Sequence, residues 1–326
     1  MEEEKEEKNI NEREQDNNIK LKYLSNLYPS HTGPDYDLIK IIEEMLLYYG
    51  TTFSIEKIAG LDNIKLYFKE EIIDSLCNID NIKNKKIKDV LLYGAPGTGK
   101  TFLVKVFSNQ EKIKILNFHP SNLISQLNKE KDKIIKIIFD ITKFYSPSIL
   151  FIDEIDLLYY KGEDEINNEL INQINILNSS NYNNGLKNII IVGATNKPWK
   201  LNDKILNLFE KKIYIPLLKE KERKKLLENE FEKYKLDKNV NLDEIDRMTE
   251  GYTGSDIYAM CQSAMYEALK RKIKDDKDFL EKESSKNFDL ILSMDDIINA
   301  IKNGNKTMSK KDLDEYKNFE KKYESQ

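Results

Sequence analysis

The stretch GAPGTGKT, from Gly94 to Thr101, constrains the fold of this chain more than any other part of its sequence. It follows the apolar run DVLLY, which has the composition of a buried strand, and precedes FLVKVF, which has the spacing of a helix. In this context the pattern G-x-x-x-x-G-K-[ST] forms a loop whose backbone N–H groups face phosphate oxygens at a helix N-terminus. The sequence therefore predicts a strand–loop–helix unit that binds the phosphates of a nucleotide.

The residues of this glycine loop have distinct predicted roles. Lys100 has the length and charge to reach the β- and γ-phosphates, and the hydroxyl group of Thr101 is a suitable ligand for Mg²⁺. The expected ligand is therefore ATP with Mg²⁺. The other residues of this segment that are predicted to line the ATP site are Gly94, Ala95, Pro96, Gly97, Thr98, Gly99 and Phe102.

Two adjacent carboxylates follow an apolar run in the segment ILFIDEID. A buried strand delivers Asp153 and Glu154 to the carboxyl edge of a parallel sheet, where the ligands of such sheets bind. Asp153 is predicted to hold Mg²⁺ through water, and Glu154 to polarise the water that attacks ATP. The alternative is a solvated acidic turn. One strand–helix unit separates this pair from the glycine loop, and that spacing favours the catalytic interpretation.

A further apolar strand, in the segment IVGATNKPW, ends in Asn196. An amide at this place orients the attacking water from the side opposite Glu154. Asparagine is also a common turn residue after a strand, so the residue type by itself supports both interpretations equally.

Strands and helices alternate over the first two thirds of the chain. Five runs have the composition of strands: KDVLLYG, KIKILNF, SPSILFID, KNIIIVGAT and KKIYIPL. Such alternation predicts a parallel sheet covered by helices, and the uninterrupted apolar runs SILFI and NIIIV predict central strands. Two amphipathic helices are predicted before the first strand, over 36–49 and 63–76.

The strand pattern ends after Pro216, and the rest of the chain has the spacing of helices. In the segment SDIYAMCQSAMYEALKR, Ser255 is the predicted N-cap, with Asp256 in the first turn. The predicted fold class is α/β: a P-loop NTPase domain with a five-stranded parallel sheet, followed by a small all-helical lid domain. The predicted boundaries are a disordered charged tail at 1–35, the nucleotide-binding domain at 36–217, the lid at 218–308 and a C-terminal helix at 309–326.

Composition excludes several other classes of protein. A net charge of −5 provides no general basic surface for nucleic acid. Cys77 and Cys261 lie far apart and are predicted to be reduced thiols, and two histidines without a C-x-x-C pair do not predict a zinc site. The N-terminus lacks the apolar segment of a signal peptide, and no apolar run has the length of a membrane span. We therefore expect a cytoplasmic protein, and an association with the cytoskeleton stays open.

Together and in this order, the motifs resemble those of the AAA ATPases, and more narrowly the branch of katanin, fidgetin, spastin and the ATPase that disassembles ESCRT filaments. The resemblance covers roughly residues 36 to 324, and its ends are most similar to the microtubule-severing members. The segments that carry it are FSIEKIAGLD, LLYGAPGTGKT, FYSPSILFIDEID, VGATNKPW, FEKKIYIPL, EGYTGSDI and MSKKDLDEYKNFEKKY.

The resemblance implies a hexameric ring, with ATP bound between neighbouring subunits and a central pore that pulls on a polypeptide. It places Ile58, Ala59 and Gly60 beside the adenine, and Gly254 and Ser255 near the ribose and phosphates. The implied partners are further copies of the chain or related AAA subunits, together with a polypeptide substrate. Tubulin and ESCRT-type filaments are both candidates for that substrate.

Three segments depart from the family pattern. Relatives carry two consecutive arginines, which reach the γ-phosphate of the neighbouring subunit, where this chain has Asn207 and Leu208. Relatives carry an aromatic residue in the first pore loop, where this chain has QLNK at 126–129. Asp164 and Glu165 stand near the position of a paired arginine in relatives. The parts expected to act on a neighbour and on substrate are therefore altered, while the phosphate-binding part is complete.

These observations favour an ATP-hydrolysing, ring-type remodeller similar to microtubule-severing enzymes. Two alternatives stay open: a hydrolysis-impaired, ATP-binding regulatory subunit of a hetero-oligomeric AAA ring, and an ATP-gated adaptor that binds a partner without turnover. The missing arginines bear on this choice because an arginine finger is worth about 10³- to 10⁵-fold in rate. Lys211 or Lys212 is a partial substitute on one interpretation and an ordinary strand-entry residue on the other.

Overall fold

The structure, a computed structural model, describes residues 22–27, 33, 35–47, 55, 58–77, 88–110, 113–121, 131–159, 164–184, 189–275 and 290–323. They belong to two compact units. The first lies within 1–52, 64–92 and 104–213, and the second within 53–63, 93–103 and 214–326. The glycine loop thus groups with the C-terminal part of the chain, and the two acidic residues group with the sheet.

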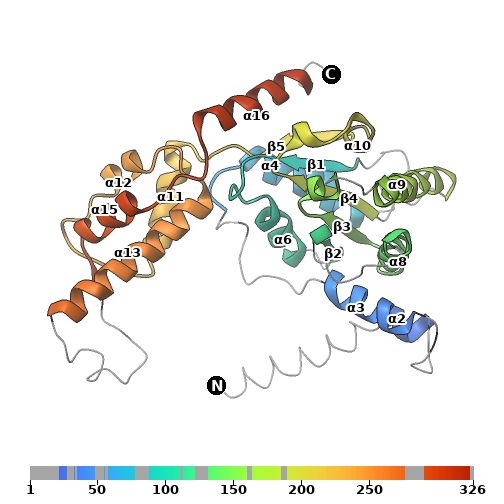
Figure 1. The fold of residues 1–326 in the computed structure, drawn as a ribbon, viewed down its shortest axis with the longest axis horizontal. Coiled ribbons are helices and arrows are strands. Elements are labelled where there is room, and N and C mark those ends of the chain that lie inside the picture. Colours follow the sequence, from blue (N-terminus) through green and yellow to red (C-terminus); the bar gives the residue numbers. More distant parts are fainter. Residues whose placement is uncertain are drawn as a thin grey trace. The chain divides into compact units, whose positions relative to one another are not determined.

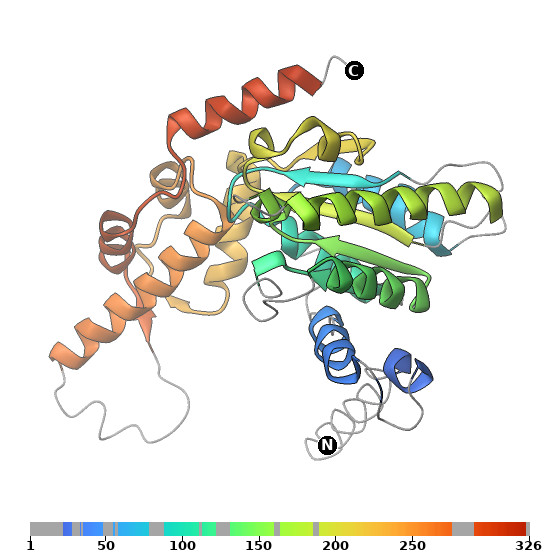
Figure 2. The same cartoon turned by 45° about the vertical axis from the view of Figure 1, so that its right-hand side comes forward.

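A five-stranded parallel sheet forms the centre of the first unit, as the alternation of strands and helices predicts. The strands lie side by side in the order β2-β3-β4-β1-β5 (Figures 1 and 2). Every residue of β1, β3 and β4 is buried, as continuously apolar strands require. All five predicted strands are confirmed, as β1 (Val90–Tyr93), β2 (Lys114–Phe118), β3 (Ser148–Ile152), β4 (Ile189–Thr195) and β5 (Lys211–Tyr214).

β3 lies between β2 and β4, so its register decides which strand ends meet. Ile152 at the end of β3 pairs with Phe118 of β2 and with Gly193 of β4. The pairing continues one residue further, because the N–H group of Asp153 donates to the carbonyl oxygen of Phe118 at 2.9 Å. The residues that follow β2 and β3 are therefore held next to each other.

The helices of the first unit follow the strands in the expected alternation. α8 (Lys131–Phe144) packs against α9 (Asp164–Asn184). α6 (Lys100–Gln110) leads out of the glycine loop, and the short elements η4 (Ile155–Tyr159), η5 (Pro198–Lys200) and α10 (Asp203–Leu206) follow β3 and β4. The helix predicted over 63–76 is confirmed as three consecutive pieces with a π-helical middle: α4 (Asp62–Tyr67), η2 (Phe68–Ile73) and α5 (Asp74–Cys77).

The amphipathic helix predicted over 36–49 is confirmed as α3 (Tyr36–Leu46). Its buried residues include Ile39, Ile42 and Leu46, which recur at helical spacing. α3 contacts both β2 and α8, so it covers the edge of the sheet where β2 lies.

A buried carboxylate fixes a second helix to α3. α2 (Lys22–Leu27) lies inside the segment predicted as a disordered tail, so that prediction is wrong for these residues. Glu43 of α3 is fully buried and accepts the N–H groups of Tyr23 and Leu24, both at 3.1 Å. Burial raises the pKa of Glu43, although the hydroxyl group of Tyr145 and the two N–H groups act in the opposite direction. The rest of the predicted tail lies almost entirely outside the described residues.

The second unit holds the predicted lid, whose helices enclose an apolar core that includes Leu227, Ile257 and Ile297. Its helical character is confirmed. One feature is additional: β6 (Lys235–Leu236) and β7 (Ile291–Leu292) pair in parallel. A two-residue strand is too short for its alternation to appear in the sequence. The helices of the lid are α11 (Glu220–Phe231), α12 (Leu242–Met248), α13 (Gly254–Asp275) and α15 (Met294–Asn303).

The N-cap of α13 is Thr253, and the prediction of Ser255 for this role is wrong. Thr253 Oγ1 accepts the N–H group of Asp256 at 3.1 Å, and the Asp256 carboxylate accepts the N–H group of Thr253 at 2.9 Å. This reciprocal pair is a capping box in which aspartate takes the place of the usual glutamate. Ser255 lies inside the first turn, where its own N–H group is available to another acceptor.

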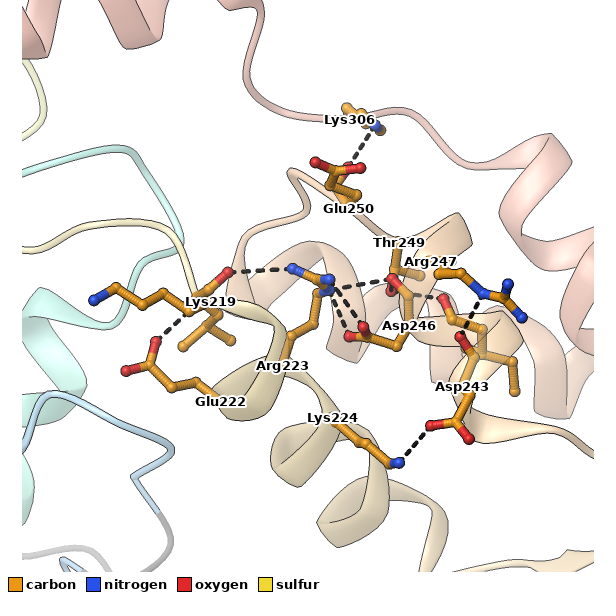
Figure 3. Close-up of polar contacts among 12 residues, drawn as sticks. Lys219, Glu222, Arg223, Lys224, Asp243, Asp246, Arg247, Thr249, Glu250 and Lys306 are labelled. Carbon is orange, nitrogen blue, oxygen red and sulfur yellow. Dashed lines mark hydrogen bonds and ion pairs between the residues drawn. The ribbon is translucent and has the colours of Figure 1, made fainter.

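Two of the chain's four arginines hold buried carboxylates in the lid. The guanidinium group of Arg223 lies 2.8 Å from the carboxylate of Asp246, and both side chains are buried (Figure 3). Arg271 lies 2.8 Å from Asp296. Burial alone would raise the pKa of Asp296, but hydrogen bonds from Arg271 and Ser293 lower it on balance. A lysine lacks the planar fork that makes these paired contacts, so arginine suits both positions better than lysine does.

The predicted C-terminal helix is α16 (Lys310–Tyr323), and it packs through an aromatic cluster. The Phe319 ring lies 5.0 Å from that of Tyr93, the last residue of β1, and the Tyr316 ring lies 5.8 Å from that of Tyr214, the last residue of β5. Tyr93 and Tyr214 stack on each other at 5.4 Å. α16 therefore contacts the strand end that leads directly into the glycine loop.

We predict that Arg223→Ala destabilises the lid by about 3 to 5 kcal/mol, because it leaves the buried carboxylate of Asp246 without its partner. Hydrogen–deuterium exchange of α11 and α12 measures the free energy of local opening. The control is Lys224→Ala in the next position, where an exposed lysine pairs with Asp243 (Figure 3). Equal protection in the two variants would contradict the prediction.

Candidate functional site

The predicted site residues fall into two groups, one in each unit. The acidic group lies at the carboxyl edge of the sheet, just beyond β3. Glu154 adopts the left-handed backbone conformation, with φ 49°, and its N–H group is 3.0 Å from the carboxylate of Asp153. A non-glycine residue in this conformation carries about 1 to 2 kcal/mol of strain, which the surrounding contacts have to offset. The turn therefore holds Glu154 in a specific direction.

Both oxygen atoms of the Glu154 carboxylate have a partner. Asn196, one residue beyond β4, points its Nδ2 at Oε1 at 3.4 Å. His119, one residue beyond β2, points its Nε2 at Oε2 at 3.3 Å. The structure thus brings Asn196 and Glu154 together at the sheet edge.

A buried hydrogen bond between two other side chains supports this arrangement. Thr195, the last residue of β4, donates its hydroxyl hydrogen to Asp156 Oδ1 at 2.7 Å. The same hydroxyl oxygen accepts the N–H group of Lys197 at 3.0 Å. Both Thr195 and Asp156 are buried, so the bond ties the turn after β3 to the turn after β4. Asn196 lies between Thr195 and Lys197, and the hydrogen bond between these two residues fixes the backbone on both sides of it.

His119 is a site residue that the sequence analysis did not identify, because histidine entered it only as a possible zinc ligand. A signal was present. His119 directly follows an apolar strand, as Asp153 and Asn196 do, and parallel strands end at one edge of a sheet. Applied to every strand, and not only to those followed by acidic or amide residues, this rule also identifies His119.

The glycine loop lies in the second unit and surrounds the ammonium group of Lys100. Lys100 is buried and donates to the carbonyl oxygens of Gly94 and Ala95, both at 2.8 Å. Thr98 closes the loop through its hydroxyl group, which donates to Ala95 at 2.8 Å. At Gly99 the φ is +96°, and a Cβ atom there would meet no atom within 4 Å. The loop thus keeps open space at the point where the helix begins.

The start of α13 contacts this loop directly. The N–H group of Ser255 donates to the carbonyl oxygen of Gly97 at 3.1 Å. Gly97 has φ +78°, and a Cβ atom there would lie 2.8 Å from Ser255 Cβ and from Thr253 Oγ1. Gly254 is also close, because its Cβ would lie 3.3 Å from the Gly97 carbonyl oxygen. Gly254 and Ser255 are therefore beside the loop, and Thr253 is a contact that the sequence analysis missed.

The three residues expected beside the adenine lie in the same unit. Ile58 and Ala59 are buried, and Gly60 has φ +66°. A Cβ atom at Gly60 would lie 2.3 Å from the carboxylate of Glu222, in the first turn of α11. Gly60 thus allows this segment to approach the lid closely. Ile58 and Ala59 supply buried apolar side chains.

The positions that depart from the family pattern are described in part. Asn207 caps the C-terminus of α10, and its side chain is exposed. Lys212 donates to the carbonyl oxygen of Phe209 at 3.0 Å, and burial lowers the pKa of its ammonium group. This contact agrees with a strand-entry role for Lys212. The pore-loop residues 126–129 lie outside the described residues, and so do the side chains of Asp164 and Glu165.

Two further observations concern ions and membranes. Within the described ranges, no group of three or more His, Cys, Asp or Glu side chains could hold a metal ion alone. Every helix in the described part of the chain is too short or too polar to span a lipid bilayer.

Family comparisons match both units. Residues 90–217 match the family described as "ATPase family associated with various cellular activities (AAA)", and residues 239–281 match the AAA+ lid domain. The A-like 1 form of the katanin p60 ATPase-containing subunit from Rattus norvegicus is 29% identical over 299 residues, which cover 88% of this chain. The human protein of that name is 28% identical. The chain spans 61% of the length of these curated relatives.

Solved structures give the same result. A crystal structure of the FIGL-1 AAA domain in complex with ADP superposes with a TM-score of 0.77 at 27% identity, and covers 90% of this chain and 99% of its own. A structure from a study of katanin self-assembly has a TM-score of 0.71 at 23% identity, over 89% of this chain and 98% of its own. The similarity to the katanin structure supports the fold of this chain.

We predict that Gly97→Ala weakens the affinity for a fluorescent ADP analogue by about tenfold or more. The new Cβ would push α13 away from the loop in addition to straining the backbone. Gly251→Ala is the matched control. Gly251 has nearly the same φ, +79°, but its Cβ would meet no atom closer than 3.8 Å. A titration in which both variants bind equally well would show that the contact between the loop and α13 is unimportant.

Proposed function

The chain carries an AAA ATPase domain and an AAA+ lid of the katanin and fidgetin branch, and from this premise we propose that it binds ATP with Mg²⁺ and hydrolyses the γ-phosphate. The observation that carries the proposal is the pair of contacts on Glu154, from Asn196 and from His119. A carboxylate held from both sides at the edge of a parallel sheet is suited to orienting one water molecule.

The glycine loop is the proposed binding site for the phosphates. Its turn is already formed, and the buried ammonium group of Lys100 lies among its carbonyl groups. We propose that Gly94–Phe102 bind the phosphates, that Gly254 and Ser255 contact the ribose and phosphates, and that Ile58, Ala59 and Gly60 contact the adenine. The buried apolar character of Ile58 and Ala59 supports this role, since a base needs an apolar surface and few polar groups.

The proposed ligands of Mg²⁺ are the hydroxyl group of Thr101 and, through water, the carboxylate of Asp153. Oxygen donors of this kind suit Mg²⁺, which keeps several waters and binds one or two protein ligands together with phosphates. When bound, Mg²⁺ neutralises charge on the phosphates. Glu154 then orients and polarises the water, and Asn196 fixes its other side.

On a larger scale we propose a cytoplasmic, ring-forming remodeller that acts on a polypeptide, similar to the katanin branch. The match over 88% of the chain to a katanin subunit supports this proposal. The ring consists of copies of this chain or of related AAA subunits. Tubulin and ESCRT-type filaments are the two candidate substrates.

A second candidate function is that of an ATP-binding regulatory subunit in a mixed ring. The specific observation behind it concerns arginine. The three arginines in the described part of the chain all belong to the lid, where Arg223 and Arg271 hold carboxylates and Arg247 donates to a backbone carbonyl group. Positions 207 and 208 carry Asn207, which is exposed, and Leu208, which is partly buried. A neighbour with arginine would supply the contact that this chain does not offer.

We expect Glu154→Gln to abolish Mg²⁺-dependent ATP turnover while it leaves nucleotide affinity within about twofold, because it removes the base and keeps the shape. Lys100→Ala is expected to lose binding itself. Phosphate release, measured over a series of protein concentrations, tests turnover, and titration with a fluorescent ATP analogue tests binding. Turnover that Glu154→Gln does not change would exclude hydrolysis at this site.

The arginine hypothesis predicts a gain of function. The double variant Asn207→Arg/Leu208→Arg should raise turnover at assembling concentrations by about 10³-fold, the lower value for an arginine finger. The control is Asn207→Lys/Leu208→Lys, which adds equal charge without the guanidinium fork. Rates of the arginine variant that stay at the unmodified level would mean that these positions do not reach a neighbouring nucleotide.

A further inference from the structure

The proposed function uses the contact between His119 and Glu154, and it leaves open what orients the imidazole ring and how that contact affects the rate. His119 directly follows β2, and its ring lies between two partners. Nε2 is 3.3 Å from Oε2 of Glu154, and Nδ1 is 2.8 Å from Oγ of Ser121. The ring is therefore connected at both of its nitrogen atoms.

The backbone explains why these side chains meet. The N–H group of Asp153 donates to the carbonyl oxygen of Phe118 at 2.9 Å. This bond holds the turn after β3 beside the end of β2, and Glu154, one residue beyond Asp153, reaches His119 from that turn. The left-handed backbone of Glu154, with φ 49°, directs its carboxylate toward the neighbouring strand ends. The contact is thus built by the sheet and does not depend on a flexible loop.

The hydrogen-bond partners determine where the proton of the imidazole lies. An ionised carboxylate accepts hydrogen bonds and cannot donate them, so the Nε2 atom that faces Glu154 has to carry a hydrogen. In a neutral ring, Nδ1 is then an acceptor, and the Ser121 hydroxyl group donates to it. The carboxylate of Glu154 therefore favours the tautomer with hydrogen on Nε2, and Ser121 supports it by donating to Nδ1 and holding the ring in place.

The two contacts on Glu154 divide its carboxylate between the flanking strands. His119 at the end of β2 holds Oε2, and Asn196 at the end of β4 holds Oε1. A carboxylate with one partner rotates more freely about its terminal bond than a carboxylate with contacts at both oxygens. A base that orients water benefits from this restriction, because misplacement by about 1 Å can reduce a rate about 100-fold.

We infer that His119, oriented by Ser121, is a positioning residue that holds the Glu154 carboxylate for ATP hydrolysis. The inference rests on the proposed function, since it assigns a role in that reaction. The contact itself contributes little to stability, because both side chains are partly exposed, at 28% for His119 and 40% for Glu154. Loss of His119 should therefore affect the rate and leave folding unchanged.

The experiment compares two replacements. His119→Gln places an amide N–H near the position of Nε2, and His119→Leu has no donor. We expect His119→Leu to lower kcat about tenfold or more, with unchanged KM for ATP and an unchanged urea midpoint, and His119→Gln to recover most of the rate. Ser121→Ala is expected to give an intermediate loss. Full turnover in His119→Leu, or an equal loss in both replacements, would overturn the inference.

The reference variant is Glu154→Gln, measured in the natural sequence and in the Asn207→Arg/Leu208→Arg background. In each background, the protein that keeps Glu154 is compared with its Glu154→Gln variant. If the protein that keeps Glu154 is no faster in either background, the proposed function fails. If it is faster, and His119→Leu is equally fast, only the inference about His119 fails.

A second measurement does not depend on turnover. The chain has two histidines, His31 and His119, so ¹⁵N-histidine NMR gives few signals, and His31→Gln assigns them. At mildly alkaline pH, where an ordinary imidazole is neutral, we expect the Nε2–H tautomer for His119. Its ring shifts should move in Glu154→Leu and in Ser121→Ala. The Nδ1–H tautomer, or shifts that neither variant moves, would contradict the proposed contacts.

Discussion

One backbone hydrogen bond, from the N–H group of Asp153 to the carbonyl oxygen of Phe118, decides which side chains meet at the acidic edge. It extends the register of β2 and β3 by one residue, so that the residues after the two strands become neighbours. A side-chain bond from Thr195 to Asp156 ties the end of β4 to the segment after β3. The geometry around Glu154 thus follows from strand pairing, and the side chains add the chemistry.

The sheet and most helices could be predicted because their signals are local and strong. The runs at β1, β3 and β4 are continuously apolar, and each of these strands is fully buried. The parts that could not be predicted depend on distant partners. α2 is a six-residue helix in a charged region, and it depends on the buried Glu43 of another helix. The pairing of β6 with β7 is equally hard to see in the sequence, because each strand has two residues.

The residues of the candidate site also divide into those that could be predicted from the sequence and those that could not. The glycine loop and the acidic pair have residue patterns of their own, so they were predicted from sequence. His119 contacts Glu154, and Thr253 lies against the glycine loop at Gly97. Both neighbours are distant in the sequence, so these contacts appear only when the chain is folded. The N-cap of α13 shows the difference clearly. Thr253 and Ser255 are both suitable caps by residue type, and the reciprocal bonds with Asp256 select the former.

The aromatic contacts of α16 have a consequence for how the protein is made on the ribosome. Tyr93 leads into the glycine loop, but its ring packs against Phe319, in the helix that is synthesised after every other element described. Nascent chains generally begin to fold from their N-terminal side. The sheet can therefore form while translation continues, whereas Tyr93 gains its contact with Phe319 only after α16 has been synthesised. Ribosome-bound intermediates of this chain would have a completed core and an immature phosphate-binding turn.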